Sequence, residues 1–530
     1  MKTKITLFLG LLFISVGCDD KFLEITPKAK YFADNFFASE DQVFQGLVAA
    51  YDPLQWSFVD GRWTSTVMLG EIWSDNANAG GDNTNFDQPG WQQIDDLTAD
   101  PLVGEVLSFW KRGYFGINKA NLVINKTELD TELTRQYIAE AKFLRAIYYF
   151  DLVRIYGPVP VILEELDPAD KNVSRNTLSE VYGQIVKDLR EAIPLLPLSY
   201  PDAFKGRITR GAAQALLGKA YLYWADLLND DVQRFDSAAF FLNEVIASGE
   251  YELVDDYNQL YDFGAANTSE SVFEIQFSNE VPGDFGTPFE FLNGNAMVQL
   301  CGIRGLCASH PLYAEGWGFM LPTQSLFDSY LADDQYRRNA SIITLFELNL
   351  DNCPVSSNQQ NPTDYTGMWQ KKYANYKAYS TPNGGELNLL KDPNQPYIRY
   401  AEVLLMYAEA LVRGSGADAE AMTYIDMVRE RAAGPGDNTG NFRTASQLMG
   451  QEGLSLLEVI WYERRAELAG EGDRWFDLVR SGRAAANNFP SGDLRQANFS
   501  ERSLYLPAPQ VDVDFTEGKL TPYPDPSLFQ

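Results

Sequence analysis

The stretch that decides the fold reads RGAAQALLGKAYLYWADLL and occupies residues 210–228. Its apolar residues recur at spacings of three or four, and the stripe consists of Ala213, Leu217, Ala220, Tyr221, Trp224 and Leu228. An α-helix has 3.6 residues per turn, so residues at these spacings share one face. We therefore predict an amphipathic helix over 210–228 whose apolar face packs against another element.

Other parts of the chain extend this pattern into helix pairs. Inside the predicted helix 210–228, LGKAY at 217–221 matches the Leu-Gly-x-x-Tyr core of a tetratricopeptide repeat. Such pairs cannot bury their apolar faces alone, so they must stack. The predicted fold class is all-α, with tetratricopeptide-like helix pairs forming a scaffold that carries long irregular loops. The further helices predicted are 136–156, 177–193, 235–248, 398–412, 417–432, 454–469 and 474–482.

Two regions interrupt the helical period. Residues 75–100 are dense in Asn, Asp, Gly and Gln, and residues 279–322 mix Gly, Pro, Phe and Trp. Loops of this length in a compact protein are usually functional. Ligand-contacting residues are therefore expected in these two regions.

Composition excludes several classes of function. The chain has 530 residues, 45% of them hydrophobic, and a formal charge of −30 from 73 acidic and 43 basic residues. A surface this acidic repels phosphate backbones, and no segregated basic patch offsets it, so we expect no nucleic-acid partner. No metal or cofactor is expected. The oxygen donors of 75–82 leave room for an adventitious or structural Ca²⁺, although Ala77 and Ala79 stand at would-be ligand positions.

The first residues have the pattern of an export signal. Lys2 and Lys4 precede an apolar run over 5–16, which is shorter than the roughly 20 residues that span a bilayer. The run ends in Ser15-Val16-Gly17-Cys18, which is similar to a bacterial lipobox. We expect residues 1–17 to be a lipoprotein signal peptide and Cys18 to carry the lipid. The alternative is an ordinary secretory signal with a coincidental cysteine.

Residues 18–530 show no Pro-rich or Ser-rich linker, so we expect one domain in which 18–340 and 341–530 are interleaved. Three cysteines remain in it, Cys301, Cys307 and Cys353. Export implies an oxidising compartment, in which a Cys301–Cys307 bridge would close a small loop. One of the three then stays free or pairs differently, and this pattern does not say which.

The sequence lacks the motifs of a Ser-His-Asp hydrolase. His310 is the only histidine, it directly precedes Pro311, and no Gly-x-Ser-x-Gly elbow accompanies it. A glycosidase needs only two carboxylates, which 73 acidic residues could supply, but the loops are rich in amides and aromatics instead. We therefore expect a protein that binds without catalysing a reaction.

Several short motifs then occur in a fixed order along the chain. They are FLE (22–24), GLVAAY (46–51), EIWSDN (71–76), EAKFLRA (140–146), YYFDLVRIYG (148–157), RYAEVLLMYAEA (399–410), ERRAEL (463–468), DRWFDLVRSG (473–482) and LPAP (506–509). Together with the lipobox, they make the chain similar to the SusD/RagB family of outer-membrane nutrient-binding lipoproteins from Bacteroidetes. The resemblance runs over essentially the whole chain.

The resemblance implies a role as well as a fold. Members are helical, sit on the cell surface through a lipid anchor in the outer membrane, and cover a SusC-like TonB-dependent transporter. They capture oligosaccharides or, in some members, peptides, and hand them over without chemistry. Three hypotheses about function follow. The protein captures a glycan, it captures a peptide, or it is a lid of the transporter that binds no ligand. We favour the first. Most matching motifs are interpreted as structural, with Arg464, Arg465, Glu467, Arg474, Asp477 and Arg480 forming a charge network in the last helix pair.

A sugar-binding site needs an exposed aromatic ring flanked by amide, carboxylate or guanidinium groups. We expect Trp91 and Trp317 to supply the rings, from loop position and side-chain chemistry. The alternative for each tryptophan is a loop anchor that packs inward. The full set of candidate ligand-binding residues is Asn76, Asn78, Asp82, Trp91, Phe289, Arg304, Trp317 and Phe319.

Overall fold

The computed structural model describes residues 36–84, 86–166, 169–228, 231–288, 291–350, 352–435 and 442–530. The predicted signal peptide, the lipidation site Cys18 and the candidate Phe289 lie outside these residues. Within the described residues, no helix combines the length and apolarity that crossing a membrane requires.

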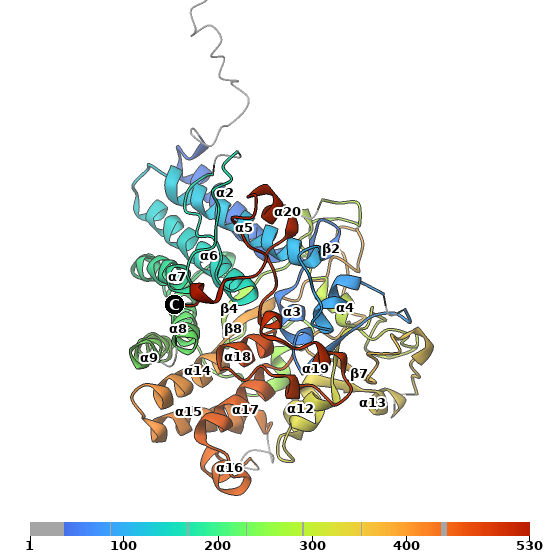
Figure 1. The fold of residues 1–530 in the computed structure, drawn as a ribbon. Coiled ribbons are helices and arrows are strands. Elements are labelled where there is room, and N and C mark those ends of the chain that lie inside the picture. The colour runs from blue at the N-terminus through green and yellow to red at the C-terminus, as the bar shows by residue number, and fades with distance from the viewer. Residues whose placement is uncertain are drawn as a thin grey trace, which may run out of the picture.

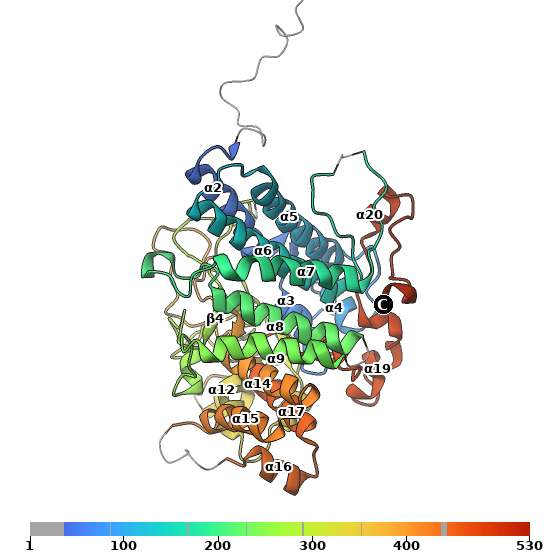
Figure 2. The same ribbon diagram turned by 90° about the vertical axis from the view of Figure 1, so that its left-hand side faces the viewer.

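Helices that are consecutive in sequence pack side by side along one side of the molecule (Figure 2). The first five are α5 (Gly104–Lys126), α6 (Glu132–Tyr156), α7 (Leu178–Ala192), α8 (Arg210–Leu227) and α9 (Val232–Ala247). The stack continues from α9 to α14 (Tyr400–Arg413), which also contacts α15 (Asp418–Ala432) and α17 (Leu456–Leu468). At the other end, α2 (Glu40–Tyr51) packs against α5 and α6. The predicted all-α class, with stacked helix pairs, is confirmed.

Local signals at the helix ends explain the good agreement in boundaries. Helix α7 begins after Thr177, whose hydroxyl caps the amide of Glu180 while the Glu180 carboxylate accepts from the Thr177 amide. Helix α6 ends at Gly157, which has a φ of 67°, a conformation that glycine adopts without strain.

Several predicted starts differ. Helix α6 begins at Glu132 rather than at 136, and α9 begins at Val232 rather than at 235. Helix α14 starts only at Tyr400, because Ile398 belongs to a strand.

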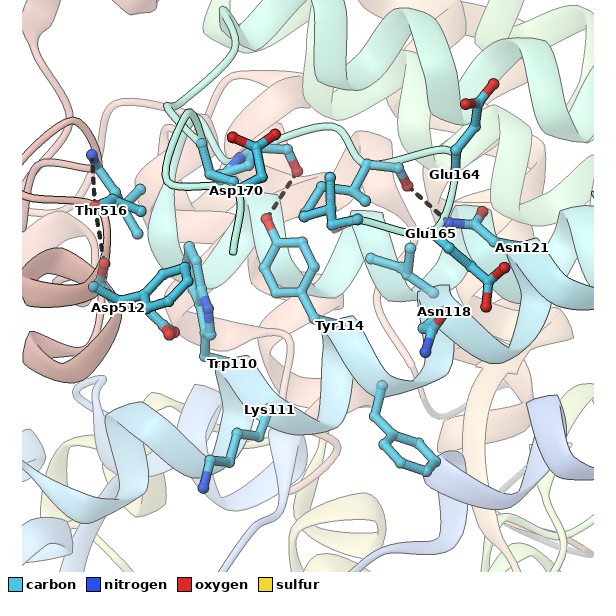
Figure 3. A pocket seen from close by; sticks show the side chains of 18 of the residues that line it. Trp110, Lys111, Tyr114, Asn118, Asn121, Glu164, Glu165, Asp170, Asp512 and Thr516 are labelled. Atoms are coloured by element: carbon cyan, nitrogen blue, oxygen red, sulfur yellow. Dashed lines mark hydrogen bonds between the residues drawn. The ribbon is translucent and has the colours of Figure 1, made fainter. Parts of the chain in front are cut away.

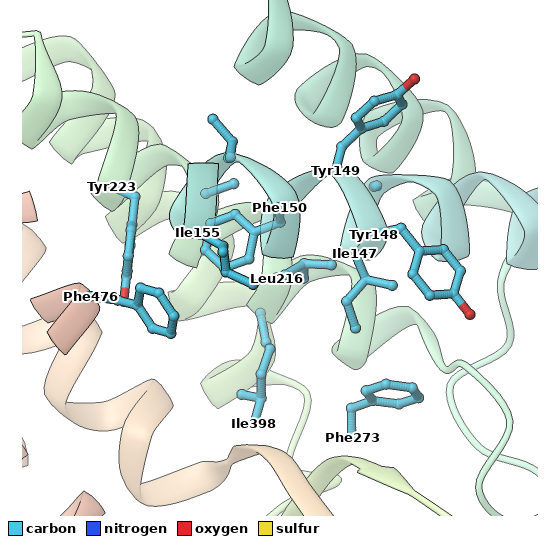
Figure 4. Close-up of a cluster of buried hydrophobic side chains, with 14 of the residues drawn as sticks. Ile147, Tyr148, Tyr149, Phe150, Ile155, Leu216, Tyr223, Phe273, Ile398 and Phe476 are labelled. Carbon is cyan, nitrogen blue, oxygen red and sulfur yellow. The ribbon is translucent and has the colours of Figure 1, made fainter. Parts of the chain in front are cut away.

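The main hydrophobic core lies where this stack meets the rest of the chain (Figure 4). Helix α6 contributes Ile147 and Phe150, and α8 contributes Leu216 and Tyr223. Phe273, Ile398 and Phe476 meet them from three segments far apart in sequence. Burying these side chains therefore joins the N-terminal and C-terminal halves of the chain.

In the part of the chain that the structure describes, the strands form four short antiparallel pairs. These are β1 (Phe58–Val59) with β2 (Arg62–Trp63), β3 (Ala77–Gly80) with β5 (Phe319–Pro322), β4 (Ser271–Ile275) with β8 (Gln395–Arg399), and β6 (Ile342–Thr344) with β7 (Met368–Gln370). Short helices occupy much of the remaining chain (Figure 1). They are α3 (Thr66–Ile72), α4 (Pro89–Asp95), α10 (Met297–Cys301), α11 (Gln324–Ser329), α12 (Gln335–Ser341), α13 (Leu345–Leu350), α16 (Ala445–Glu452), α18 (Arg474–Arg480), α19 (Leu494–Asn498) and α20 (Gln510–Phe515).

The predicted charge network between the last helices is confirmed for Arg464, Asp477 and Arg480. Arg465, Glu467 and Arg474 instead pair with residues outside that helix pair. Arg464 of α17 and Arg480 of α18 each place a guanidinium nitrogen 2.8 Å from the Asp477 carboxylate. The two arginine neighbours hold the pKa of Asp477 below its usual range, although burial alone would raise it. Arg474 reaches further and pairs with Asp75 at 2.7 Å. The network therefore also positions the start of the first long loop.

The predicted Cys301–Cys307 disulfide is wrong. Cys307 pairs with Cys353, with a Cα–Cα distance of 5.5 Å, and Cys301 is a buried free cysteine. Cys301 ends helix α10 and faces the main core, whereas Cys307 packs with Cys353 against a second, smaller core. The two cysteines that are nearest in sequence therefore belong to different hydrophobic clusters.

Candidate functional site

The two irregular regions predicted to carry the ligand lie side by side. Strand β3 comes from the first region and β5 from the second, with Asn78 opposite Leu321 and Gly80 opposite Phe319. The amide of Gly81 also donates to the carbonyl of Gly318 at 2.8 Å. Residues more than 200 positions apart in sequence are therefore held side by side by backbone hydrogen bonds.

An aromatic cluster lies beside this strand pair and is formed by Phe58, Trp63, Phe285 and Trp317. The Trp317 ring is 5.4 Å from Trp63 and 6.3 Å from Phe285, centroid to centroid, and Phe285 is nearly parallel to it. Phe58 in turn contacts Trp63 at 4.7 Å. Trp63 is buried, Trp317 is half-buried, and Phe285 has 58% of its surface exposed. The cluster thus extends from the buried core to the solvent-exposed surface.

Polar side chains border the cluster on the side of the first loop. The Arg304 guanidinium donates to the Trp317 carbonyl at 2.7 Å and lies 3.3 Å from the Asp87 carboxylate. Asp87 also accepts the amide of Asp82 at 2.9 Å. Arg304 therefore connects the aromatic loop to the acidic loop and fixes the position of both.

The two carboxylates of this border titrate differently. Burial raises the pKa of Asp87 above its ordinary value, because the nearby Arg304 only partly offsets the lost hydration. The pKa of Asp82 is lowered instead, since two hydrogen bonds from Thr84 outweigh its slight burial. Asp82 thus presents a charged acceptor to solvent over a wide pH range.

The structure therefore brings three of the predicted residues together, namely Asp82, Arg304 and Trp317. Their side chains remain partly accessible, and Arg304 contacts both loops. Their contact with a ligand remains a prediction.

The expectation that Trp91 presents an exposed ring is wrong. Trp91 lies in the short helix α4, is fully buried, and packs edge-on against Phe109 with a centroid distance of 6.0 Å. Phe319 is also buried, because β5 directs it into the main core. Both side chains anchor their loops inward, so neither can stack on a ligand in this structure.

The two candidate asparagines hold the first loop in place. Asn76 is buried, donates to the Glu71 carboxylate at 3.0 Å and accepts from Arg465 at 2.9 Å. Asn78 donates to the Asp364 carbonyl at 3.1 Å and accepts from Arg495 at 2.9 Å. Because these amides are already bonded within the protein, their role here is structural.

Three exposed aromatic residues of the two irregular regions are not among the candidates predicted from the sequence. Phe285 lies in Gly283-Asp284-Phe285-Gly286, and Phe86 and Phe291 have 80% and 62% of their surface exposed. A large apolar residue inside an aperiodic, glycine-rich loop is the signal that could have identified them. A preference for tryptophan over phenylalanine overlooks these residues, because loop position alone does not show which rings face outward.

The described part of the chain holds no cluster of three or more His, Cys, Asp or Glu side chains arranged for a metal ion. His310 is buried, its Nδ1 accepts the amide of Tyr313 at 2.9 Å, and its ring stacks on Tyr313 at 4.9 Å. This histidine therefore shapes its loop.

Comparisons with known proteins agree over most of the length of the chain. The model of the SusD family matches residues 346–526, and the model described as "Starch-binding associating with outer membrane" matches residues 21–222. SusD-like protein P2 of Formosa agariphila is 28% identical over 97% of each chain. A SusD-like protein of Bacteroides ovatus is 24% identical over 90% of this chain and 82% of its own.

Solved structures share the fold. Surface glycan-binding protein A from Bacteroides thetaiotaomicron, solved with laminarihexaose, superposes with a TM-score of 0.79 at 26% identity, over 91% of this chain and 98% of its own. A laminarin binding SusD-like protein superposes with a TM-score of 0.76 at 31% identity, over 91% of this chain and 99% of its own. Both family models, the full-length relatives and these structures lead to the same conclusion: the chain belongs to the SusD family.

Proposed function

We propose that this protein captures an oligo- or polysaccharide at the cell surface and delivers it to a SusC-like TonB-dependent transporter in the outer membrane. The observation that carries the proposal is the aromatic cluster, with half-buried Trp317 and exposed Phe285, bordered by Arg304 and Asp82. Two solved neighbours named for laminarin or laminarihexaose support a glycan as the ligand.

The chemistry of the cluster suits a sugar ring. A pyranose has an apolar C–H face and a rim of hydroxyl groups, so it stacks on an aromatic ring while its hydroxyls bond to charged groups nearby. Phe285 and Trp317 supply the rings, and Asp82 supplies carboxylate acceptors. The Arg304 guanidinium, which already bonds the Trp317 carbonyl, holds the ring beside these acceptors.

The expected affinity is modest. Covering about 60 Å² of apolar surface on each ring contributes roughly 1.5 kcal/mol at about 25 cal/mol/Å². Two rings and a few hydrogen bonds, less the cost of association, correspond to a Kd between about 1 μM and 1 mM. Weak binding at each site suits a carrier that must release its cargo, and a polymeric glycan gains from multivalency.

The test uses the soluble form without residues 1–18 and compares laminarin, starch and other polysaccharides by affinity electrophoresis. We expect one glycan class to retard the protein. Trp317→Ala and Phe285→Ala should each weaken binding about tenfold, because each removes about 1.5 kcal/mol of binding free energy. Phe240→Ala is the matched control, because Phe240 is 59% exposed but lies on α9. Retardation that is equal in all three variants would show that the aromatic cluster is not the site.

Two alternatives have distinct outcomes in the same assay. Capture of peptides would give no retardation by any glycan but binding to a peptide mixture, and a lid that binds nothing would give neither. We expect carriage without catalysis, so the bound glycan should be recovered at its original chain length. Chromatography of the glycan after incubation would reveal new reducing ends if the protein cleaved it.

Delivery requires the predicted lipid anchor and the transporter partner. We expect the full-length protein to carry lipid on Cys18 and to fractionate with the outer membrane, and Cys18→Ala to release it. The transporter proposal predicts that a tagged form co-purifies a SusC-like membrane protein from its native cells. Recovery of the protein alone under mild detergent would contradict that partnership.

A further inference from the structure

One cavity shares no lining residue with the aromatic cluster, although Trp56 and Val59, which line it, are close to Phe58 in sequence. It has a volume of about 600 Å³ and lies against α5, between the loop that follows α6 and the segment of α20 (Figure 3). Cavities of this size accommodate ligands in many proteins. We name it the α5 groove and define it by Trp110, Tyr114, Asn118, Asn121, Leu166 and Phe515, which are among its lining residues.

The groove is elongated because it follows one face of a helix. Trp110, Tyr114, Asn118 and Asn121 are separated by four, four and three positions, so they recur on the same side of α5. At 1.5 Å of rise per residue, the distance from Trp110 to Asn121 is about 16 Å. An extended peptide advances about 3.3 Å per residue, so about five residues would fill this length.

The walls expose apolar side chains from three separate elements. Phe115 of α5 is 37% exposed, Leu166 of the loop after α6 is 46% exposed, and Phe515 of α20 is 44% exposed. A ligand lying in the groove would remove these side chains from water, which is the main source of affinity for an apolar segment.

The charged groups around the groove are mostly acidic. Its lining holds five carboxylates and one ammonium group, that of Lys111. Lys111 pairs with Asp60, and Lys126 from outside the lining pairs with Glu165 at 3.3 Å. Lys119, also outside the lining, places its ammonium nitrogen 4.8 Å from the centroid of the Phe115 ring.

The five carboxylates of the lining still outnumber these three lysines, and they include groups at both ends. Figure 3 shows Asp512 near Trp110 and the Glu164–Glu165 pair near Asn121. The charge pattern therefore complements a ligand with positive groups at its two ends.

The polar groups on the floor argue against a sugar as the occupant. The Tyr114 hydroxyl donates to the Pro160 carbonyl at 2.8 Å. The Asn121 amide donates to Ile162 at 3.0 Å and accepts from Arg145 at 2.9 Å. The Thr516 hydroxyl donates to the Asp512 carbonyl at 2.9 Å. Because these floor groups are already bonded to the protein, a sugar would find hydrogen-bonding side chains mainly in Asn118, Lys111 and the carboxylates of the lining, and none on the apolar walls.

We propose that the α5 groove binds an extended peptide segment of a partner protein, with apolar side chains in its middle and a basic residue near each end. The elongated shape, the exposed apolar walls and the acidic ends carry this assignment. The site is independent of the proposed glycan site, so each can fail without the other.

The direct test uses three synthetic pentapeptides and isothermal titration calorimetry with the folded, soluble protein. Acetyl-Lys-Leu-Phe-Leu-Lys-amide has the proposed chemistry. Acetyl-Glu-Leu-Phe-Leu-Glu-amide reverses the charge, and acetyl-Lys-Gly-Ser-Gly-Lys-amide keeps the charge but lacks the apolar middle. We expect only the first to bind with a Kd below about 1 mM, and raising the ionic strength to weaken it. Equal binding of the reversed peptide, or no binding of the first, would overturn the proposal.

Two groove variants locate the binding. Neutralising the acidic ends with Glu164→Gln, Glu165→Gln and Asp512→Asn, or adding a positive charge on the exposed face of α5 with Asn118→Arg, should weaken the first peptide about tenfold or more. The control makes the same change in charge elsewhere, with Glu244→Gln, Glu250→Gln and Glu430→Gln, all of which are exposed. Equal loss in the control would show a non-specific effect of net charge and refute the site.

The same variants separate this proposal from the glycan proposal. Glycan retardation should be unchanged by the groove variants, and Trp317→Ala should leave peptide binding unchanged. Displacement of the peptide by a glycan, together with loss of glycan binding in Asn118→Arg, would instead assign the groove to the glycan.

Discussion

Cys301 illustrates how burial controls the chemistry of a single residue. Its side chain is enclosed by the main core, and burial raises the pKa of its thiol well above the ordinary value. The thiolate is the reactive form, so a thiol held protonated reacts slowly with electrophiles. Cys307 and Cys353 are joined to each other and close a loop with a sequence separation of 46.

This arrangement predicts the outcome of thiol labelling. In the native, unreduced protein, iodoacetamide should label none of the cysteines 301, 307 and 353, and after denaturation it should label Cys301 alone. Peptide mass mapping should recover a crosslinked pair that contains Cys307 and Cys353. A crosslink that contains Cys301 would contradict the structure.

The disulfide also has an expected effect on stability. Cys353→Ser combined with Cys307→Ser should lower the free energy of unfolding by about 3 to 5 kcal/mol, because the bridge restricts the unfolded chain. Chemical denaturation followed by circular dichroism would measure the change. Cys301→Ser is the comparison, since it alters a buried thiol without opening the crosslink.

At the scale of elements, helices α5 and α6 approach closely at two glycines. A Cβ added at Gly116 would lie 2.3 Å from the Tyr148 ring, and one at Gly113 would lie 2.7 Å from Leu152. Tyr148 is itself buried and donates to the Ala50 carbonyl at 2.8 Å, which limits its freedom to move. The absence of side chains at these two positions therefore sets the separation of the two helices.

Gly116→Ala should consequently destabilise the fold. The added methyl group overlaps a fixed aromatic ring, and overpacking of this kind costs about 1 to 3 kcal/mol. Gly183→Ala is the matched control, because Gly183 lies inside α7 with open space around its Cβ position. There the better helix propensity of alanine should stabilise the protein by about 1 kcal/mol. Denaturant midpoints that move in the same direction would refute this packing argument.

At the scale of the whole molecule, a buried ionic network joins distant segments. Glu467 of α17 accepts from Arg337 of α12 and from Arg399 of β8, both at 3.1 Å, and also pairs with Arg431 of α15. Burial alone would raise the pKa of Glu467, but the arginines hold it at about 2. The folded state therefore favours the charged form of Glu467 more strongly than the unfolded state does.

The sign of the pH dependence follows from this lowered pKa. The contribution of Glu467 is fully present above its ordinary carboxyl pKa of about 4.5 and is lost as the pH falls towards about 2. The free energy of unfolding of Glu467→Gln should fall by about 3 to 5 kcal/mol at pH 7, since three buried guanidinium groups lose their partner. The variant should also lose less stability than the wild type between these two pH values.

Urea denaturation at a series of pH values would check both statements. Glu430→Gln serves as the control, because Glu430 is exposed on the neighbouring helix α15. A Glu467→Gln variant with unchanged stability at pH 7 would show that the network contributes nothing to folding.

The sequence alone determined the helical scaffold, its main boundaries and the family. These features rest on local signals, namely the apolar period in 210–228, the caps at Thr177 and Gly157, and short motifs in a fixed order. Such signals act over a few turns of chain, so they can be read without knowing which segments meet. The charge network around Asp477 was predictable for the same reason, because its arginines share two adjacent helices.

Only the tertiary structure decided which cysteines pair, which aromatic rings face solvent, and which cavity the chain encloses. Trp91 and Trp317 both lie in aperiodic segments, yet one is enclosed beside Phe109 and the other is half-buried against Phe285. That difference arises from contacts such as the pairing of β3 with β5, which joins residues more than 200 positions apart. The sequence of an aperiodic loop does not indicate which segments the loop will contact. The exposure of its side chains therefore depends on the distant segments that pack against it.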